Sequence, residues 1–273
     1  MDDLPDDKVR ALKALLRKYY EWEAECGDGT ALMYEAVQTL ERYEHHQRRR
    51  AVLKLLGVSE GDRILEIGCG EGHYLSKMAE RGCGSLVGLD ISLGKLKMAK
   101  SRLLQNEFDL LTADAESLPF KDDSFHWILC TETIEHLLAP GKALEEIRRV
   151  LKRGGQAVVS TPTWRGTAGQ GRQESSASLS TLVESHFGRP FEGHLWSFTA
   201  SSFIRLLERT GLEPVTKLTV SVFDAHGWQR LRAVVKSPRL QLWLQHLIDA
   251  TLTPLFGAEV FSRYLVCLVR RKR

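Results

Sequence analysis

Short apolar runs alternate with helical patterns through the middle of the chain. Runs typical of buried strands occupy residues 62–67, 85–89, 108–111, 125–131 and 156–161. Between these runs, apolar residues recur every three to four positions, as they do on the buried face of a helix. Strands that alternate with helices at this spacing predict an α/β fold with a doubly wound, mostly parallel sheet. Right-handed crossovers then bring the carboxyl ends of the strands to one edge, where ligands bind.

Individual residues mark several of the expected helix ends. Ser92 and Thr199 are good N-cap residues, because a side-chain oxygen at that position accepts a backbone N–H group. The helix that starts at Pro140 carries its apolar residues on one face and is expected to end at the glycine pair 154–155. The first helix of the core is expected over 71–81.

The pattern changes on both sides of this core. Residues 8–56 read as helical, with a break at 27–29. Residues 162–198 are rich in Gly, Ser, Arg and Gln, and then in aromatic residues and histidine. Because this irregular segment follows the fifth strand, we expect it to lie over the ligand-binding edge as a lid.

The remaining elements complete the same sheet. Expected in order are a helix over 199–211, a strand near 214–223, an amphipathic helix over 238–257 and a final strand over 264–269. We therefore divide the chain into an N-terminal helical cap (1–56), a ligand-binding core (57–161), a lid insertion (162–198) and the C-terminal part of the sheet domain (199–273).

A strand that ends in alternating glycines points to the kind of ligand. Glu66 is followed by Gly68, Gly70 and Gly72. Glycine lacks a Cβ atom, so it adopts positive φ and lets a ligand lie against the main chain. A dinucleotide fingerprint, G-x-G-x-x-G, requires glycine where this chain has His73. The pattern therefore disfavours NAD and favours another adenosine-bearing ligand.

Six segments carry a more specific resemblance. They read EIGCGEG at 66–72, GLDIS at 88–92, DAESLPF at 114–120, DDSFHW at 122–127, IEHL at 134–137 and LKRGG at 151–155. In this order they resemble the motifs of class I S-adenosylmethionine-dependent methyltransferases, in the UbiE/COQ5-like (methyltransferase type 11) branch. The resemblance implies a seven-stranded Rossmann-like sheet that binds S-adenosyl-L-methionine and transfers a methyl group to a small-molecule or lipid-like acceptor by in-line displacement.

The resemblance also implies a set of cofactor-binding residues. They are Glu66, Gly68, Gly70, Gly72, Asp90, Ile91, Asp114, Ala115 and Thr131. Glu66 and the Thr131 backbone would bind the amino-acid end, and Asp90 would accept both ribose hydroxyls. Ile91 would pack on the adenine, while Asp114 and the Ala115 N–H would bind its polar edge.

The three carboxylates in this set also have a purely structural interpretation. Glu66 could bond the loop backbone at the end of its strand. Asp90 could stabilise the N-terminus of the helix that Ser92 caps. Asp114 could be an ordinary turn residue. The order of the motifs favours the cofactor role for each.

The methyl transfer needs orientation and the exclusion of water more than it needs a dedicated catalytic group. If the acceptor is a hydroxyl, a histidine is the natural general base near neutral pH. His136 and His194 are the candidates, and a structural role remains the alternative for each. Near the fourth strand, only Glu132 and Glu135 suggest metal ligands by their spacing, so we expect no metal.

Composition narrows the choice of partners. The net charge of +3 is too small to favour nucleic acid, although the basic runs at 48–50 and 270–273 allow a weak attraction to anionic lipid. The five cysteines are scattered without a C-x-x-C pair, which favours free thiols in a reducing cytoplasm. With no long apolar run, we expect a cytoplasmic protein with at most peripheral membrane contact.

Two alternatives remain open at the level of sequence. One is a nicotinamide-dependent oxidoreductase, which His73 disfavours. The other is a non-catalytic methyltransferase-like subunit that binds a partner protein; the intact Glu66, Asp90 and Asp114 argue against it. The identity of the acceptor, the atom that is methylated and the oligomeric state stay undetermined.

Overall fold

The computed structural model describes residues 5–26, 40–102, 108–163, 172–173, 194–220, 237, 240, 243–244 and 264–272. Its elements are α1 (Asp6–Cys26), α3 (Leu40–Leu55), β1 (Arg63–Ile67), α4 (His73–Ala79), β2 (Ser85–Asp90), α5 (Leu93–Arg102), β3 (Phe108–Thr112), β4 (Phe125–Thr131), η1 (Ile134–His136), α6 (Pro140–Val150), β5 (Leu151–Pro162), β6 (Arg172–Gln173), β7 (Trp196–Ser197), α8 (Ala200–Arg209), β8 (Leu212–Val220) and β9 (Tyr264–Arg271).

A seven-stranded sheet forms the centre of the molecule, in the order β3-β2-β1-β4-β5-β9-β8. The first five of these strands run parallel, and β9 runs antiparallel to both β5 and β8. The predicted doubly wound, mostly parallel α/β sheet is thereby confirmed. The order reverses between β1 and β4, which places the carboxyl ends of these two strands beside the crevice where such sheets bind ligands.

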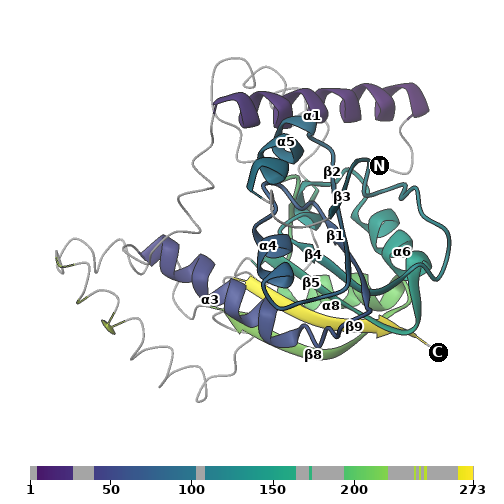
Figure 1. Ribbon diagram of the computed structural model, residues 1–273. Helices are drawn as coiled ribbons and strands as arrows, with labels where there is room; N and C mark the ends of the chain where they lie inside the picture. Colours follow the sequence, from purple (N-terminus) through teal and green to yellow (C-terminus); the bar gives the residue numbers. More distant parts are fainter. Residues whose placement is uncertain are drawn as a thin grey trace.

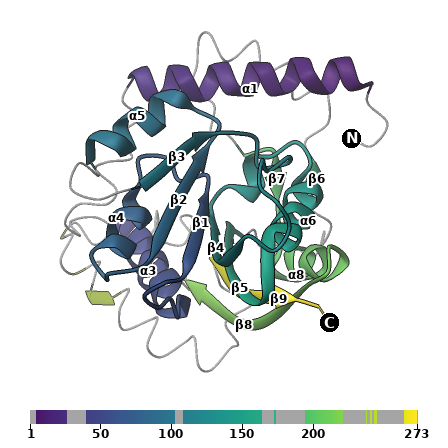
Figure 2. The same ribbon diagram turned by 45° about the vertical axis from the view of Figure 1, so that its right-hand side comes forward.

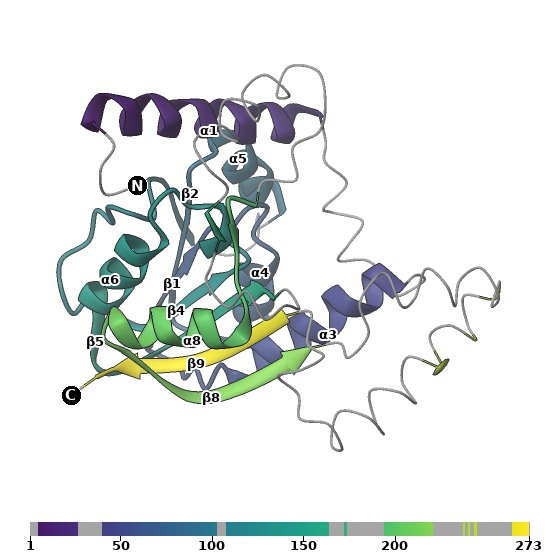
Figure 3. The ribbon, with the colours of Figure 1, turned by 180° about the vertical axis from the view of Figure 1, so that it is seen from behind.

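Helices cover both faces of the sheet (Figures 1 and 2). On one face α3, α4 and α5 pack over an apolar cluster that includes Val52, Leu75 and Leu96. On the other face lie α6 and α8, seen from behind in Figure 3. They contribute Leu144 and Phe203 to a second cluster. Because both faces are covered, the central strands are largely apolar, as their sequence pattern predicted.

Helix α1 lies apart from these two layers, across the carboxyl ends of the strands (Figure 1). On the apolar side of α1, Leu16 packs against Leu138 and Leu195. The segment predicted as one helical cap thus contains two described helices with different places: α1 lies over the ligand-binding edge, whereas α3 packs on a face of the sheet.

The predicted caps are confirmed. Ser92 Oγ accepts the Lys95 N–H at 3.1 Å, and Thr199 Oγ1 accepts the Ser202 N–H at 3.1 Å. Thr199 and Ser202 form a reciprocal capping box, because the Ser202 hydroxyl oxygen also accepts the Thr199 N–H.

The predicted end of the helix that starts at Pro140 was wrong. Helix α6 ends at Val150, and Leu151 is already extended and paired with Phe125 in the sheet. Burial of the Leu151 side chain in the core decides this boundary. The glycine pair instead lies within β5, where a Cβ atom on Gly155 would come within 2.8 Å of the His126 carbonyl oxygen. These glycines therefore allow an irregular strand start and do not stop a helix.

Two expectations fall mainly outside the described residues. Of the predicted helix 238–257, only Leu240, Trp243 and Leu244 belong to the described part, and they are helical. Of the predicted lid, the described parts are its two ends and the short strand β6, which pairs with β7. Within the described part of the chain, no helix has both the length and the apolar character needed to cross a membrane.

Candidate functional site

The glycine loop after β1 is held against the end of β2. Its Gly68 and Cys69 N–H groups donate to the Leu89 carbonyl oxygen at 2.7 and 3.0 Å. Gly68 has a φ of 69°, and a Cβ atom there would lie 2.2 Å from Thr133 Oγ1, so no larger residue fits. Gly70 also has positive φ, but a Cβ atom there would meet nothing within 4 Å. The loop therefore closes tightly on the β4 side and leaves open space beside Gly70.

Asp90 is the last residue of β2 and is oriented from two sides. Its Oδ2 accepts the Gly70 N–H at 2.9 Å, and its Oδ1 accepts the Ser92 N–H at 2.9 Å. Burial raises the pKa of the Asp90 carboxyl, and these backbone hydrogen bonds partly offset the rise. The structure thus places a fixed carboxylate between the glycine loop and the start of α5, and Ile91 follows it, half buried.

Glu66 is buried beneath the same loop. It is 2% exposed, and its Oε2 has no hydrogen-bond partner among the described residues. Burial raises the pKa of the Glu66 carboxyl well above its usual value; a hydrogen bond from the Leu75 backbone opposes this rise, and the nearby Asp90 adds to it. A buried carboxylate oxygen without a donor is unusual in a folded protein and suits a site that receives a cationic ligand group.

Helix α1 supplies contacts to this edge that the sequence did not predict. The Glu21 carboxylate accepts the Leu93 N–H at 2.6 Å and the Gly94 N–H at 2.8 Å, so α1 caps α5. Lys13 Nζ bonds Asp114 Oδ2 and Glu116 Oε2. The apolar spacing of 8–26 predicts a helix, but nothing in it indicates which loop these polar residues meet.

Asp114, Ala115 and Thr131 lie at the ends of the neighbouring strands. Asp114 is the second residue after the end of β3, and its Oδ1 accepts the Glu116 N–H at 2.9 Å. Ala115 is buried beside it. Thr131 closes β4, and its carbonyl oxygen accepts the Thr133 hydroxyl at 3.0 Å. These three predicted residues therefore share the carboxyl edge with Asp90 and Glu66.

The two candidate histidines come together although they are far apart in the sequence. The rings of His136 and His194 have centroids 4.9 Å apart. The segment at His194 is tied to η1 because the Leu195 N–H donates to the Glu135 carbonyl oxygen at 2.8 Å. Tyr20 of α1 places its ring edge-on to His136, with centroids 6.2 Å apart.

An ion pair supports this region from the sheet side. Arg48 of α3 is 6% exposed and bonds Glu132 Oε2 through Nη1 at 2.9 Å. Its guanidinium also lies over the Tyr264 ring. Glu132 has a φ of 50°, and its Oε1 accepts the Ser160 hydroxyl at 2.8 Å. The charged pair thus joins α3 to the residue that follows β4.

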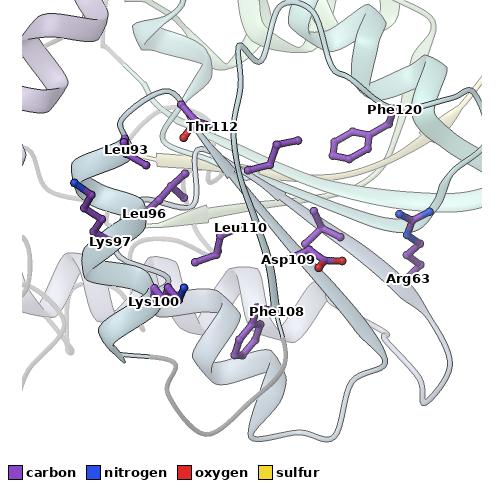
Figure 4. A pocket seen from close by; sticks show the side chains of 12 residues that line it. Arg63, Leu93, Leu96, Lys97, Lys100, Phe108, Asp109, Leu110, Thr112 and Phe120 are labelled. Atoms are coloured by element: carbon purple, nitrogen blue, oxygen red, sulfur yellow. The ribbon is translucent and has the colours of Figure 1, made fainter.

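A cavity of about 820 Å³ lies elsewhere, at the outer edge of the sheet (Figure 4). It is lined by α5 and β3 side chains, among them Leu96, Lys97 and Phe108. None of the nine predicted cofactor residues lines it. This cavity is therefore distinct from the carboxyl-edge site.

Comparisons with known proteins agree with this arrangement. A family profile described as "Methyltransferase domain" matches residues 65–159. The demethylmenaquinone methyltransferase of Paenarthrobacter aurescens (strain TC1) is 30% identical over 181 residues, which cover 64% of this chain and 70% of that relative. The chain belongs to the class I S-adenosylmethionine-dependent methyltransferases. The Paenarthrobacter relative, of which this chain covers 70%, places the chain in the UbiE-like branch. The demethylmenaquinone methyltransferase of Renibacterium salmoninarum is 34% identical over 54% of this chain and 62% of its own length.

Solved methyltransferase structures share the fold. A chain described as a methyltransferase, in complex with the Trm112 methyltransferase activator of Haloferax volcanii, has a TM-score of 0.62 at 17% identity, over 93% of this chain and 98% of that chain. Geranyl diphosphate C-methyltransferase from Streptomyces coelicolor A3(2), in complex with S-adenosyl-L-homocysteine, has a TM-score of 0.55 at 17% identity, over 82% of this chain and 78% of that chain. At such identities the likeness concerns the fold alone.

The cofactor of this methyltransferase is S-adenosyl-L-methionine, and the nicotinamide alternative is excluded. The site fits two polar parts of the cofactor: Glu66 offers an unsatisfied carboxylate oxygen for a cationic end, and Asp90 offers a fixed carboxylate for a diol. The open space beside Gly70 adds room for the main body of the ligand.

Proposed function

We propose that the methyltransferase holds its cofactor with the nine residues predicted from the sequence. Glu66 and the Thr131 backbone bind the amino-acid end, and the backbone of Gly68, Gly70 and Gly72 lies along it. Asp90 accepts the ribose hydroxyls, which compete with its present donors at Gly70 and Ser92. The observation that carries this proposal is the buried, unsatisfied oxygen of Glu66 beside the glycine loop.

The adenine end is proposed to lie between Ile91 and the loop after β3. Asp114 accepts the adenine amino group, and the Ala115 N–H donates to a ring nitrogen. Because Lys13 of α1 bonds Asp114, α1 takes part in closing this end of the site. The bound cofactor supplies an activated methyl group, while the protein orients it and keeps water away.

The acceptor is proposed to be a small, lipid-like molecule bound at the histidine pair. His136 lies in η1 after the end of β4, with His194 beside it, and the pair is proposed to assist loss of a proton from an acceptor hydroxyl. Two relatives are named for a demethylated menaquinone, which supports a lipid-like acceptor. In-line displacement requires only that the acceptor atom lie opposite the sulfonium sulfur.

Contact with a membrane surface is part of the same proposal. Leu240 and Trp243 are 46% and 58% exposed and lie three residues apart, on one side of a helical turn. Together with the basic residues 270–273, they favour a cytoplasmic protein that reaches its acceptor at the membrane surface. Binding to anionic vesicles and to neutral vesicles tests this point, and equal absence of binding would contradict it.

The test of the cofactor site is calorimetry with S-adenosyl-L-methionine. Asp90→Asn removes the charge that is proposed to accept two ribose hydroxyls, so we expect at least a tenfold loss of affinity, about 1.4 kcal/mol. Asp109→Asn is the matched control, since Asp109 is an exposed acid on β3 far from the proposed ligand. Unchanged affinity in Asp90→Asn would refute the ribose role. Release of S-adenosylhomocysteine with a panel of quinols and phenols then identifies the acceptor class.

A further inference from the structure

Three metal-ligating side chains meet beside the proposed acceptor position. Glu135, His136 and His194 each offer one ligand atom, and these atoms all lie within 4.8 Å of one another. Zinc holds such nitrogen and oxygen atoms at about 2.1 Å, so neighbouring ligands around one ion lie about 3.4 Å apart. Side-chain rotations that move each ligand atom by roughly 1 Å therefore allow all three atoms to bind one ion.

Glu135 is a buried carboxyl group with one oxygen paired and the other left without a partner among the described residues. The residue is 0% exposed, and its Oε2 accepts the Thr161 hydroxyl at 3.2 Å. Its Oε1 has no hydrogen-bond partner among the described residues and lies 3.8 Å from His136 Nε2. The neighbouring cation, Arg48, makes its ion pair with Glu132. A buried carboxylate oxygen of this kind is stable when it coordinates a cation.

The backbone holds the three residues in place before any ion binds. Two hydrogen bonds flank the pair of histidines: the Leu195 N–H donates to the Glu135 carbonyl oxygen at 2.8 Å, and Trp196 Nε1–H donates to the Leu137 carbonyl oxygen at 2.8 Å. They join the segment that carries His194 to η1 on both sides of His136. Such a fixed arrangement is typical of a metal site and costs little reorganisation on binding.

We propose that Glu135, His136 and His194 bind one divalent transition-metal ion of the zinc(II) class. Two imidazoles and one carboxylate suit such borderline ions, whereas Mg²⁺ prefers an all-oxygen site. Three protein ligands leave a coordination position open for an exogenous oxygen. Tyr20 of α1 lies beside one of the proposed ligands: its ring meets His136 edge-on, and its buried hydroxyl has no hydrogen-bond partner among the described residues.

The sequence-based expectation of no metal considered only Glu132 and Glu135 near β4. His194 joins them only in the folded chain, and Glu132 is engaged by Arg48 instead. The ion's use rests on the proposed function: it binds an acceptor hydroxyl, whose proton passes to water more readily on the metal. The oxygen then forms a bond to the methyl carbon of the sulfonium donor, and the C–S bond breaks with its electron pair on sulfur.

The test is a metal titration of the full chain after dialysis against a chelator. Calorimetry with Zn²⁺ is expected to give one equivalent, and Co²⁺ is expected to give visible absorption bands of a nitrogen- and oxygen-ligated ion. Glu135→Gln and His194→Ala are each expected to weaken Zn²⁺ binding at least tenfold. His126→Ala is the matched control, since His126 lies at the opposite end of β4 and bonds the Arg63 N–H. Mg²⁺ is expected not to compete.

Several outcomes decide the matter. Wild-type protein that binds no Zn²⁺, or a His194→Ala variant that binds it as tightly as His126→Ala does, overturns the proposed site. Should His194→Ala fold poorly, His194→Asn and a Zn²⁺-dependent rise of the wild-type melting temperature replace it, and absence of that rise counts against the site. The same samples are titrated with S-adenosyl-L-methionine: binding without Zn²⁺ binding defeats only the metal site, whereas no cofactor binding defeats the proposed function.

Discussion

At the scale of single residues, the main feature of the site is a set of carboxylates that do not all receive their full number of hydrogen bonds from the protein. Asp90 receives two backbone N–H groups, whereas Glu66 keeps an oxygen without a donor. Because an unsatisfied buried carboxylate lowers stability, its presence under the glycine loop is best explained by a ligand that completes it. The structural interpretation of Glu66 also holds in part, since the Leu75 backbone bonds it.

The pKa of Glu66 gives the first prediction at this scale. Burial raises this pKa in the free protein, and a bound ammonium group would lower it. The affinity for S-adenosyl-L-methionine is therefore expected to increase as the pH rises from the usual glutamate value to the raised one. The stability of the free protein is expected to fall over the same window, because the folded state holds the proton that the unfolded state has lost.

Glu66→Gln isolates this effect. The variant is expected to bind the cofactor more weakly and with less dependence on pH, while Asp90, whose pKa is also raised, titrates as before. Glu80→Gln serves as the control, since Glu80 is an exposed acid at the end of α4. Calorimetry at a series of pH values measures the slope; identical slopes for Glu66→Gln and wild type would remove Glu66 from the amino-acid end of the site.

At the scale of elements, α1 is the helix whose position in the fold the sequence pattern does not predict. It is docked by a carboxylate that caps another helix, by Lys13 on the loop after β3 and by an apolar contact at Leu16. Helix N-termini expose backbone N–H groups that need acceptors, and Glu21 supplies two oxygens to α5. This explains why α1 lies across the cofactor edge and not on a face of the sheet.

Loss of this contact is the prediction for α1. Glu21→Gln removes the charge at the N-terminus of α5, and we expect it to destabilise the fold by about 1–2 kcal/mol and to speed cofactor release several-fold. Glu25→Gln is the matched control on the same helix, because Glu25 is exposed. Denaturant unfolding and stopped-flow dissociation measure the two effects; a release rate equal to that of the control would show that α1 does not close the site.

At the scale of the whole molecule, one buried charge links three elements. Arg48 of α3 bonds Glu132 at the end of β4 and lies over Tyr264 of β9. Its side chain is 7% exposed and that of Glu132 is 17% exposed, so both charges are largely withdrawn from water. Such a pair contributes little when intact, but the removal of one partner leaves a buried charge uncompensated.

Arg48→Met is therefore expected to destabilise the protein by about 3–5 kcal/mol. The double variant Arg48→Met with Glu132→Gln is expected to recover part of this loss, because the Glu132 charge is removed together with its partner. Urea unfolding of both variants measures the free energies of unfolding. Equal destabilisation in the single and double variants would show that packing against Tyr264, and not charge compensation, accounts for the role of Arg48.

Much of the fold and half of the site follow from sequence for a local reason. The alternation of apolar runs and helices decides the parallel sheet, and the caps at Ser92 and Thr199 depend on residues within three positions. The glycine loop, Asp90 and Asp114 each follow a strand directly, so parallel topology alone brings them to one edge. By contrast, the end of α6 depends on burial of Leu151 in the sheet, which no helix signal encodes.

The sequence by itself determined the methyl donor, because every residue assigned to it lies within a few positions of a strand end. Only the tertiary structure decided which residues gather around the two histidines. Tyr20, Glu135 and His194 come from three distant segments. One backbone hydrogen bond and one from the Trp196 side chain bring the last two together. Contacts between distant segments depend on how whole elements pack. A pattern that repeats every two or four residues predicts single helices and strands, but it does not predict these contacts.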